Sequence, residues 1–455
     1  MLERVSDQGS HPPSRRRLFA GVCAPVLAAL SIGVAACGSS GGSTSTSGGS
    51  STAATSGAST ATGGVNGDQI NKILRLDGKN SGKGMKIKLG ALLALTGPGS
   101  FYGTNQGNGI KLAAAQIKAA GGPDFELEFK DHKSANAQAG VQAGREFGID
   151  HVPVVLTSYV ADIGAMFPAL AQYKMLGLDG GGGTSDFGQG KPYFWGMRAI
   201  EPDDDFIGAL QYWKATDPKI KRVSLVYFDQ GPVNKVVIGN FNKAVAATGM
   251  QVANAVSSTI GQTDFSAPIA KLKSANPDAV FLFGTGVDPG YFMKQYVAAG
   301  VGAPVIGSEY ITDAAKVAGP AFDKYMFATD WFNPAKPANN WSKLFLDSYQ
   351  KRFGTRPEIN SANYYEDTFA VWDLVRRVLA KGQSITGENL QNALIADPKF
   401  QSIYGGSGAQ LGEIALDTKT HTVTERPLQV YKSNGGNPIE VASFDLGGAN
   451  FQLTK

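Results

Sequence analysis

The chain has 455 residues, of which 42% are hydrophobic and 18% are charged, and its formal net charge is +4. This apolar content suffices for a buried core, and the lack of a Lys/Arg cluster with interleaved aromatic residues argues against a nucleic-acid partner. The only cysteines are Cys23 and Cys37, so the folded body is not expected to rely on a disulfide.

The first 36 residues have the three parts of an export signal. Arginines at 15–17 precede an apolar run that ends in small residues. Residues 34–38 read Val-Ala-Ala-Cys-Gly and resemble a bacterial lipobox, in which the chain is cleaved before the cysteine and the cysteine is acylated. We therefore predict a signal peptide over 1–36, lipidation of Cys37, and export to the extracytoplasmic face of the cell membrane.

Two alternatives accompany this signal. Residues 14–19, Ser-Arg-Arg-Arg-Leu-Phe, also resemble a twin-arginine motif, so the general secretory and twin-arginine export routes both stay open. An uncleaved transmembrane anchor is disfavoured, because two glycines, a proline and a serine thin a run that barely reaches the ~20 residues of a bilayer span.

Residues 38–64 contain only Gly, Ser, Thr and Ala. Such a composition cannot bury apolar area, so we expect a flexible tether with a root-mean-square reach of roughly 30 Å. We assign 37–84 to the lipidated cysteine and its linker, and we expect the folded body to begin at 85.

From residue 86 onward, short apolar runs alternate with longer segments of helical spacing, which predicts α/β units built on parallel sheets. The predicted strands are 87–95, 152–157, 175–178, 222–228, 279–283, 305–306, 413–417, 427–432 and 439–444. The predicted helices are 109–119, 161–173, 205–214, 235–247, 289–299, 341–353, 364–381 and 388–395. A body of about 370 residues suits two domains better than one sheet.

Catalytic signatures are mostly missing. The four histidines are far apart, so no zinc site is expected. Residues 284–289, Gly-Thr-Gly-Val-Asp-Pro, lack the third glycine of a dinucleotide-binding turn. The four glycines at 180–183 follow a predicted strand and are either a bare flexible loop or a place where a ligand anion meets backbone N–H groups. We expect no cofactor and no metal.

Residues 89–103 run from a strand through Thr-Gly-Pro to Tyr-Gly before a helix. This order resembles the opening of the leucine/isoleucine/valine-binding protein family, the extracytoplasmic solute receptors of ABC importers. Further segments resemble the family in the same order: 109–122 with a Gly-Gly exit, 263–272 with Thr-Asp-Phe-Ser, 284–300 with an Ala-Ala-Gly exit, and 306–309. The likeness covers most of 85–435.

The resemblance implies an α/β fold of the type I periplasmic-binding-protein kind, with two doubly wound lobes of parallel-type sheets joined by a three-strand hinge. It places lobe 1 at 85–198 plus 330–417 and lobe 2 at 199–329 plus 427–455. The ligand is then expected between the lobes, at the carboxyl ends of strands and near helix N-termini, with the lobes closing over it before it meets a permease.

The resemblance also implies the site. The residues expected to bind the ligand are Tyr102, Ser158, Gly181, Thr184, Thr285 and Glu309. Glu309 lies where relatives that bind amino acids place a carboxylate toward the ligand's ammonium group, and a desolvated ammonium needs a charged partner. The alternative for Glu309 is an exposed glutamate at a strand end.

Ser158, chosen within 157–159, and the segment from Gly181 to Thr184 lie where the family holds the ligand's carboxylate. Tyr102 matches a tyrosine that lines the side-chain pocket, and Thr285 matches a position that is often aromatic. The chain departs from the family at 230–234, Gln-Gly-Pro-Val-Asn, where a ligand-contacting Tyr-Gly is expected. We therefore expect a roomier pocket or a ligand other than a plain aliphatic amino acid.

The leading hypothesis is a lipid-anchored receptor without catalysis, which binds an amino acid or a related amide or carboxylate and delivers it to an ABC permease. A ligand-sensing receptor of the same fold that signals through a membrane partner is the alternative. An enzyme that uses Glu309, Asp288 and Asp179 as a carboxylate set ranks third, because no nucleophile–base pair supports it.

Overall fold

The computed structural model describes residues 65–158, 160–182, 190–198 and 203–454. All of them belong to one compact unit that begins at residue 60. The predicted signal peptide, Cys37, Thr184 and the predicted linker up to residue 64 lie outside the described residues. The rest of the predicted linker is described and contains a helix, Gly67–Leu74, whose Ile70 and Leu74 are buried in the hydrophobic core. The folded body therefore begins before residue 85, where it was expected to start.

The described chain alternates between helices and strands. The helices are α1 (Gly67–Leu74), α2 (Ser100–Ala119), α3 (Ala137–Ile149), α4 (Val160–Tyr173), α6 (Asp203–Thr216), α7 (Asn234–Thr248), α8 (Ser266–Ala275), α9 (Asp288–Ala298), α10 (Thr312–Ala318), α11 (Asn340–Phe353), α12 (Ile359–Ala380) and α13 (Gly387–Ala396). The strands are β1 (Lys86–Leu93), β2 (Asp124–Asp131), β3 (Val154–Thr157), β4 (Leu176–Asp179), β5 (Phe194–Gly196), β6 (Arg222–Phe228), β7 (Gln251–Ser258), β8 (Ala279–Phe283), β9 (Val305–Gly307), β10 (Tyr325–Thr329), β11 (Lys399–Ser407), β12 (Gln410–Leu416), β13 (Val423–Glu425), β14 (Leu428–Lys432), β15 (Ile439–Phe444) and β16 (Gln452–Leu453).

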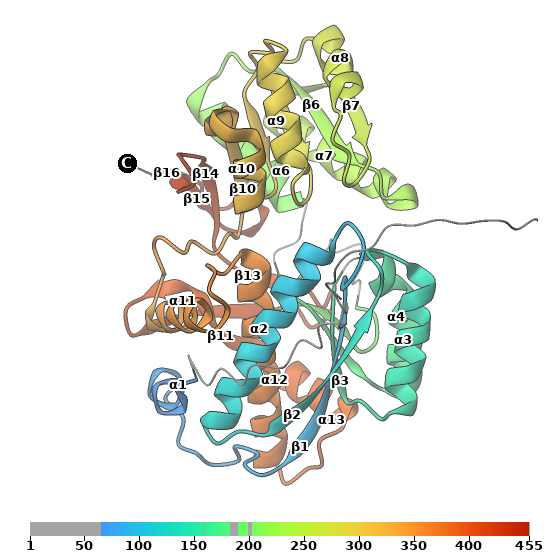
Figure 1. Cartoon of the computed structure of the whole chain (residues 1–455), viewed down its shortest axis with the longest axis vertical. Helices are drawn as coiled ribbons and strands as arrows, with labels where there is room; N and C mark the ends of the chain where they lie inside the picture. The colour runs from blue at the N-terminus through green and yellow to red at the C-terminus, as the bar shows by residue number, and fades with distance from the viewer. Residues whose placement is uncertain (1–64, 159, 183–189, 199–202, 455) are drawn as a thin grey trace, which may run out of the picture. The chain divides into compact units, whose positions relative to one another are not determined.

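The first sheet has five parallel strands in the order β2-β1-β3-β4-β5. Successive side chains of a strand point to opposite faces, and β1 shows this directly. Leu89 and Leu93 belong to the core shared with α2 and α12, whereas Leu92 packs with residues of α3 and α4. The sheet is therefore covered on both faces, as a buried parallel sheet requires; Figure 1 shows α3 and α4 together beside it.

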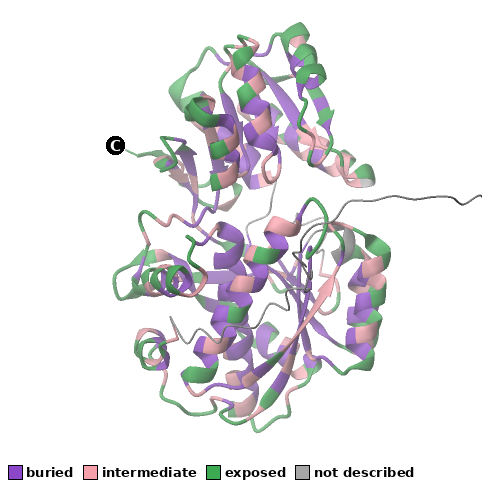
Figure 2. Ribbon diagram, in the orientation of Figure 1, coloured by how far each residue is buried: buried purple, intermediate pink, exposed green. Residues whose placement is uncertain are grey.

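The second sheet has eight strands in the order β16-β15-β14-β10-β9-β8-β6-β7. Strands β6 to β10 run parallel, and β14 to β16 pair antiparallel. In β8, Phe281 packs into one core with α6 and α7, and Leu282 packs into another core with α9. The central strands of this sheet are buried, and Figure 2 shows exposed residues on the outer sides of the helices. Two doubly wound parallel-type sheets confirm the predicted α/β fold class.

Three connections join the first sheet, with the elements that pack against it, to the second sheet and its helices. Residues 197–202 lead from β5 to α6, residues 330–339 lead from β10 to α11, and residues 426–427 lead from β13 to β14. Strands β11, β12 and β13 form a third, three-stranded sheet. Among the described residues, no helix combines the length and apolar content that a bilayer span needs.

Most predicted elements are present, and the largest error in a boundary concerns α2. This helix begins at Ser100, not at 109. Its first half contains glycines, which lower helix propensity but permit close packing. A Cβ atom on Gly109 would lie 2.2 Å from the carbonyl oxygen of Ser361 in α12, and one on Gly103 would lie 2.0 Å from that of Ala94. Close packing against neighbouring backbone therefore explains why α2 contains glycines that weaken the sequence signal for a helix.

Candidate ligand-binding site

The turn between β1 and α2 is held in place by the β2–α3 connection. The Asp131 carboxylate accepts hydrogen bonds from the amide of Leu95 at 2.9 Å and from the Thr96 hydroxyl at 2.5 Å. The Ser134 hydroxyl donates to the Thr96 carbonyl and accepts from the amide of Gly99. Burial raises the pKa of Asp131, but these hydrogen bonds and those from neighbouring amides outweigh it and lower that pKa. The fixed turn positions the first turn of α2.

Tyr102, in that first turn, reaches residues that follow two strands of the second sheet. Its hydroxyl donates to Glu309 Oε2 at 2.6 Å and lies 2.5 Å from the Thr285 hydroxyl. The amide of Gly286 donates to the Tyr102 hydroxyl oxygen and, at 3.1 Å, to Glu309 Oε2. Gly286 has a φ of +61°, which glycine adopts without strain. The structure thus brings three predicted site residues, Tyr102, Thr285 and Glu309, into one hydrogen-bonded cluster.

The backbone of Glu309 is also held. The Tyr325 hydroxyl, from β10, donates to the Glu309 carbonyl oxygen at 2.7 Å. This contact needs a glycine in β9, because a Cβ atom on Gly307 would lie 2.1 Å from that hydroxyl oxygen. Glu309 is therefore fixed by a neighbouring strand, while its carboxylate faces Tyr102 and the amide of Gly286.

Ser158 lies at the end of β3, with its side chain in the protein interior. Its hydroxyl donates to the Leu92 carbonyl at 3.3 Å and lies 3.1 Å from His132 Nε2. His132 Nδ1 accepts from the amide of Ala135, so the imidazole proton is assigned to Nε2, which donates to Ser158. Both side chains are fully buried. His132 is a partner of Ser158 that the sequence pattern did not reveal.

Gly181 follows the neighbouring strand β4, and its amide faces a carboxylate of the protein itself. The amides of Gly181 and Gly182 both donate to Asp179 Oδ1 at 3.0 Å. The other oxygen of Asp179 accepts from the Thr157 hydroxyl at 3.1 Å. Burial raises the pKa of Asp179 to about 7. Ser158 and Gly181 are neighbours, since a Cβ atom on Gly181 would lie 3.7 Å from the Ser158 Cα atom.

Asp288 is the third carboxylate of the set considered for an enzyme, beside Glu309 and Asp179. Asp288, at the start of α9, accepts a hydrogen bond from the amide of Gly261 at 3.0 Å, and burial raises its pKa to about 6. Within the part of the chain that the structure describes, no group of three or more His, Cys, Asp or Glu residues is arranged to hold a metal ion.

The segment that departs from the resembled family forms a turn stabilised by its own side chains. Asp229 Oδ1 accepts from the amide of Gly231 at 2.8 Å and from the Asn234 side-chain amide at 2.6 Å. The amide of Gln230 donates to Asn234 Oδ1. The turn therefore closes on itself directly after β6, at the strand end where a ligand contact was expected.

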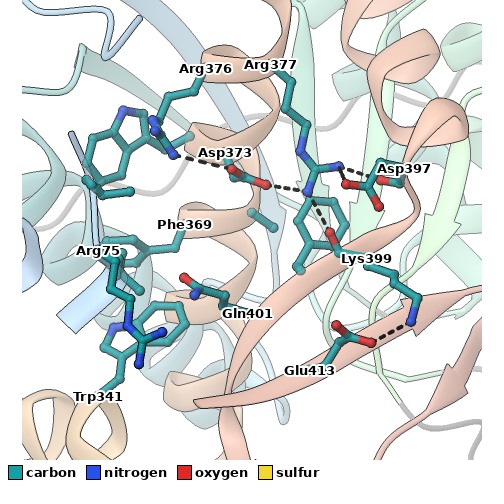
Figure 3. Close-up of a pocket in the computed structure, with 15 residues that line it drawn as sticks. Arg75, Trp341, Phe369, Asp373, Arg376, Arg377, Asp397, Lys399, Gln401 and Glu413 are labelled. Carbon is teal, nitrogen blue, oxygen red and sulfur yellow. Dashed lines mark hydrogen bonds and ion pairs between the residues drawn. The ribbon is translucent and has the colours of Figure 1, made fainter. Parts of the chain in front are cut away.

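A separate cavity of about 430 Å³ lies beside α12 and β11. Its wall includes Trp341, Phe369 and Phe400, and no predicted ligand-binding residue lines it. Figure 3 shows the charged side chains at this cavity bonded to one another: Arg377 pairs with Asp373 and Asp397, and Lys399 pairs with Glu413.

Comparison with known proteins identifies the family. Residues 86–437 match the family described as periplasmic binding protein. A Leu/Ile/Val-binding protein homolog 1 from Brucella melitensis is 25% identical over 340 residues, which cover 73% of this chain and 86% of that protein.

Two solved structures have the same fold. The branched-chain amino acid transporter substrate binding protein LivJ from Streptococcus pneumoniae, in complex with isoleucine, gives a TM-score of 0.67 at 18% identity and covers 79% of this chain and 99% of its own. An ABC transporter solute binding protein from R. palustris, in complex with benzoate, gives 0.68 at 18% identity and covers 81% and 98%. These relatives are solute-binding proteins and not enzymes, and with the match over most of its folded body this chain belongs to the periplasmic binding protein family.

Proposed function

We propose that this protein is a lipid-anchored extracytoplasmic receptor that binds an amino acid, or a related amide or carboxylate, and delivers it to an ABC importer. The observation that carries the proposal is the cluster of Tyr102, Thr285 and Glu309, which joins α2 to the ends of β8 and β9. Tyr102, in the helix that follows β1 of the first sheet, thus meets residues that follow β8 and β9 of the second sheet, at the strand ends where ligands bind in open α/β folds.

The charge of Glu309 favours a ligand that carries an ammonium group. An ammonium group adds the attraction of an opposite charge to its hydrogen bonds with the carboxylate, which the uncharged Tyr102 hydroxyl that donates to Glu309 in this structure cannot do. The relatives support a small solute as the ligand. One is named for leucine, isoleucine and valine, one was solved with isoleucine, and one was solved with benzoate. In this proposal, the ligand's carboxylate binds to Ser158, Gly181 and Thr184.

The proposed lobes are 85–198 plus 330–417 and 199–329 plus 427–455, joined by the three connections between the sheets. Closure of such lobes over a ligand creates the shape that a permease recognises. A ligand-sensing receptor that signals through a membrane partner shares every feature of this site, and the neighbouring genes would distinguish the two roles.

Ligand binding should compact the protein. We expect leucine, isoleucine or valine, or an aromatic acid such as benzoate, to bind in calorimetric titration, and small-angle scattering at saturation to show a smaller radius of gyration than that of the ligand-free protein. A ligand that saturates the protein and leaves its dimensions unchanged would contradict a closing receptor.

Lipidation of Cys37 should decide where the protein resides. The Cys37→Ala variant is expected to remain an unprocessed precursor or to leave the membrane fraction, because an acyl chain requires the thiol. Cell fractionation followed by mass spectrometry of the N-terminal peptide measures both outcomes, and Cys23→Ala is the matched control. Normal processing and membrane retention of Cys37→Ala would exclude the lipid anchor.

A further inference from the structure

Each of the three connections between the two larger sheets carries one buried charged residue. Arg198 follows β5, Asp330 follows β10, and Arg426 lies between β13 and β14. All three side chains are at least nine-tenths buried. We call these three residues the hinge triad. Their burial is informative, because a charged group leaves water only at a large energetic cost unless it is paired.

Asp330 is the centre of the hinge triad. Its Oδ1 accepts a hydrogen bond from Arg198 Nε at 2.9 Å, and its Oδ2 lies 2.5 Å from Arg426 Nε as an ion pair. Burial alone would raise the pKa of Asp330, but the two guanidinium groups outweigh it and hold that pKa below its ordinary value. One carboxylate thus links all three connections.

The hinge triad also reaches the glycine segment 180–182 that follows β4. A terminal nitrogen of Arg198 donates to the Gly181 carbonyl at 2.9 Å. A terminal nitrogen of Arg426 donates to the Asn363 side-chain oxygen at 2.8 Å, and the Asn363 side-chain nitrogen donates to the Gly180 carbonyl at 3.0 Å. Two chains of polar contacts therefore run from Asp330 to consecutive carbonyls of this segment: one through Arg198, and one through the ion pair with Arg426 and then Asn363.

The opposite side of the glycine segment is held as well, because the amides of Gly181 and Gly182 donate to Asp179. Glycine is required for this packing: a Cβ atom on Gly180 would lie 2.1 Å from Asp367 Oδ2. The segment is therefore built against the buried side chains of the sheet and of α12 and is not a bare loop. Its conformation depends on Asp179 on one side and on the hinge triad on the other.

We propose that Arg198 is a positioning residue that couples the hinge to the glycine segment. Its planar guanidinium uses three nitrogens in three directions: toward Asp330, toward the Gly181 carbonyl and, at 3.1 Å, toward the Thr329 hydroxyl. Any rotation of β10 relative to β5 moves the Asp330 and Thr329 partners, and the guanidinium must then shift against Gly181. The inference rests on the proposed function, in which this segment faces the ligand.

Arg198→Lys tests the coupling, because lysine keeps the charge but lacks the planar fork and cannot hold three partners in fixed directions. In the full-length, ligand-free chain we expect amide hydrogen exchange in the peptide containing Gly181 and Gly182 to become about tenfold faster or more, as loss of a charge-assisted hydrogen bond allows local opening. Arg377→Lys is the matched control, since Arg377 also donates to two backbone carbonyls and pairs with a carboxylate away from the hinge triad.

A second measurement reports on the hinge itself. Spin labels at Gln138→Cys in α3 and Ala267→Cys in α8, in a chain with both native cysteines replaced by serine, give the distance between elements of the two sheets. We expect Arg198→Lys to broaden this distance distribution and Arg377→Lys to leave it unchanged. If Arg198→Lys does not fold, Thr329→Val removes one of the three partners and should give a smaller change of the same kind.

Unchanged exchange at Gly181 and Gly182, or an unchanged distance distribution, would overturn the coupling. Both readouts are made without ligand, so they stand apart from the proposed function. If no candidate solute binds the wild-type protein, the receptor assignment fails while the positioning role of Arg198 is still decided.

Discussion

Asp330→Asn is expected to destabilise the folded protein by about 3–5 kcal/mol, the range for removing one member of a buried ion pair. Asparagine keeps the shape of the side chain but removes the charge that Arg198 and Arg426 share. Two buried guanidinium groups would then face a neutral amide, and Glu366 would be the remaining carboxylate partner of Arg426. Urea unfolding at neutral pH measures the loss.

Asp373→Asn is the matched control for this experiment. Asp373 also sits between two arginines, Arg376 and Arg377, but its side chain is 36% exposed. A pair this exposed contributes about 1 kcal/mol or less, so the same substitution should have a small effect. A loss below about 1 kcal/mol for Asp330→Asn as well would mean that the hinge triad does not stabilise the fold.

The pH dependence of Asp330→Asn follows from the lowered pKa of Asp330. A carboxyl group whose pKa is lower in the folded state stabilises the protein above its ordinary pKa, and that stabilisation is lost as the pH falls through the folded-state pKa. The free energies of unfolding of wild type and variant should therefore differ fully at neutral pH and converge as the pH falls below the ordinary value of 3.8.

The central strands of both sheets were predictable because they are buried on both faces and read as continuous apolar runs. Strands β6 and β8 have the predicted bounds. Edge strands lack that signal. Strand β2 and strand β7 each lie at the edge of a sheet, and most of their residues are half-buried or exposed. Their mixture of polar and apolar residues does not distinguish a strand from a surface loop.

The residues of the proposed site were expected one at a time, each from its own local motif. Family resemblance placed Tyr102, Thr285 and Glu309, and the structure joins them. The hinge triad could not be predicted in this way, because its members are separated by more than ninety residues and become neighbours only when three connections are packed together. Residue 330 is the expected start of the second segment of lobe 1, but nothing local identifies the two arginine partners of Asp330.

Glu309→Gln should weaken the binding of an ammonium-bearing ligand by about 30-fold or more, because losing half of a buried charged pair costs about 2–5 kcal/mol. Glutamine keeps the length of the side chain and can still accept from Tyr102 and from the amide of Gly286, which bond the carboxylate in the ligand-free structure. The cluster should therefore persist, and the change in affinity reports the charge. Calorimetric titration of wild type and variant with the same solute measures it.

The matched control is Glu126→Gln on the edge strand β2. Glu126 forms an exposed ion pair with Lys86, so its replacement should leave the affinity for the ligand unchanged. The chemistry of the ligand decides the outcome at Glu309. If the solute is an acid without nitrogen, Glu309→Gln should leave binding unchanged or improve it, because a charge of the same sign as the ligand's has been removed. If the solute is an amino acid and its affinity is untouched, Glu309 does not meet the ammonium group, and the carboxylate serves only to hold Tyr102 and the amide of Gly286 in place.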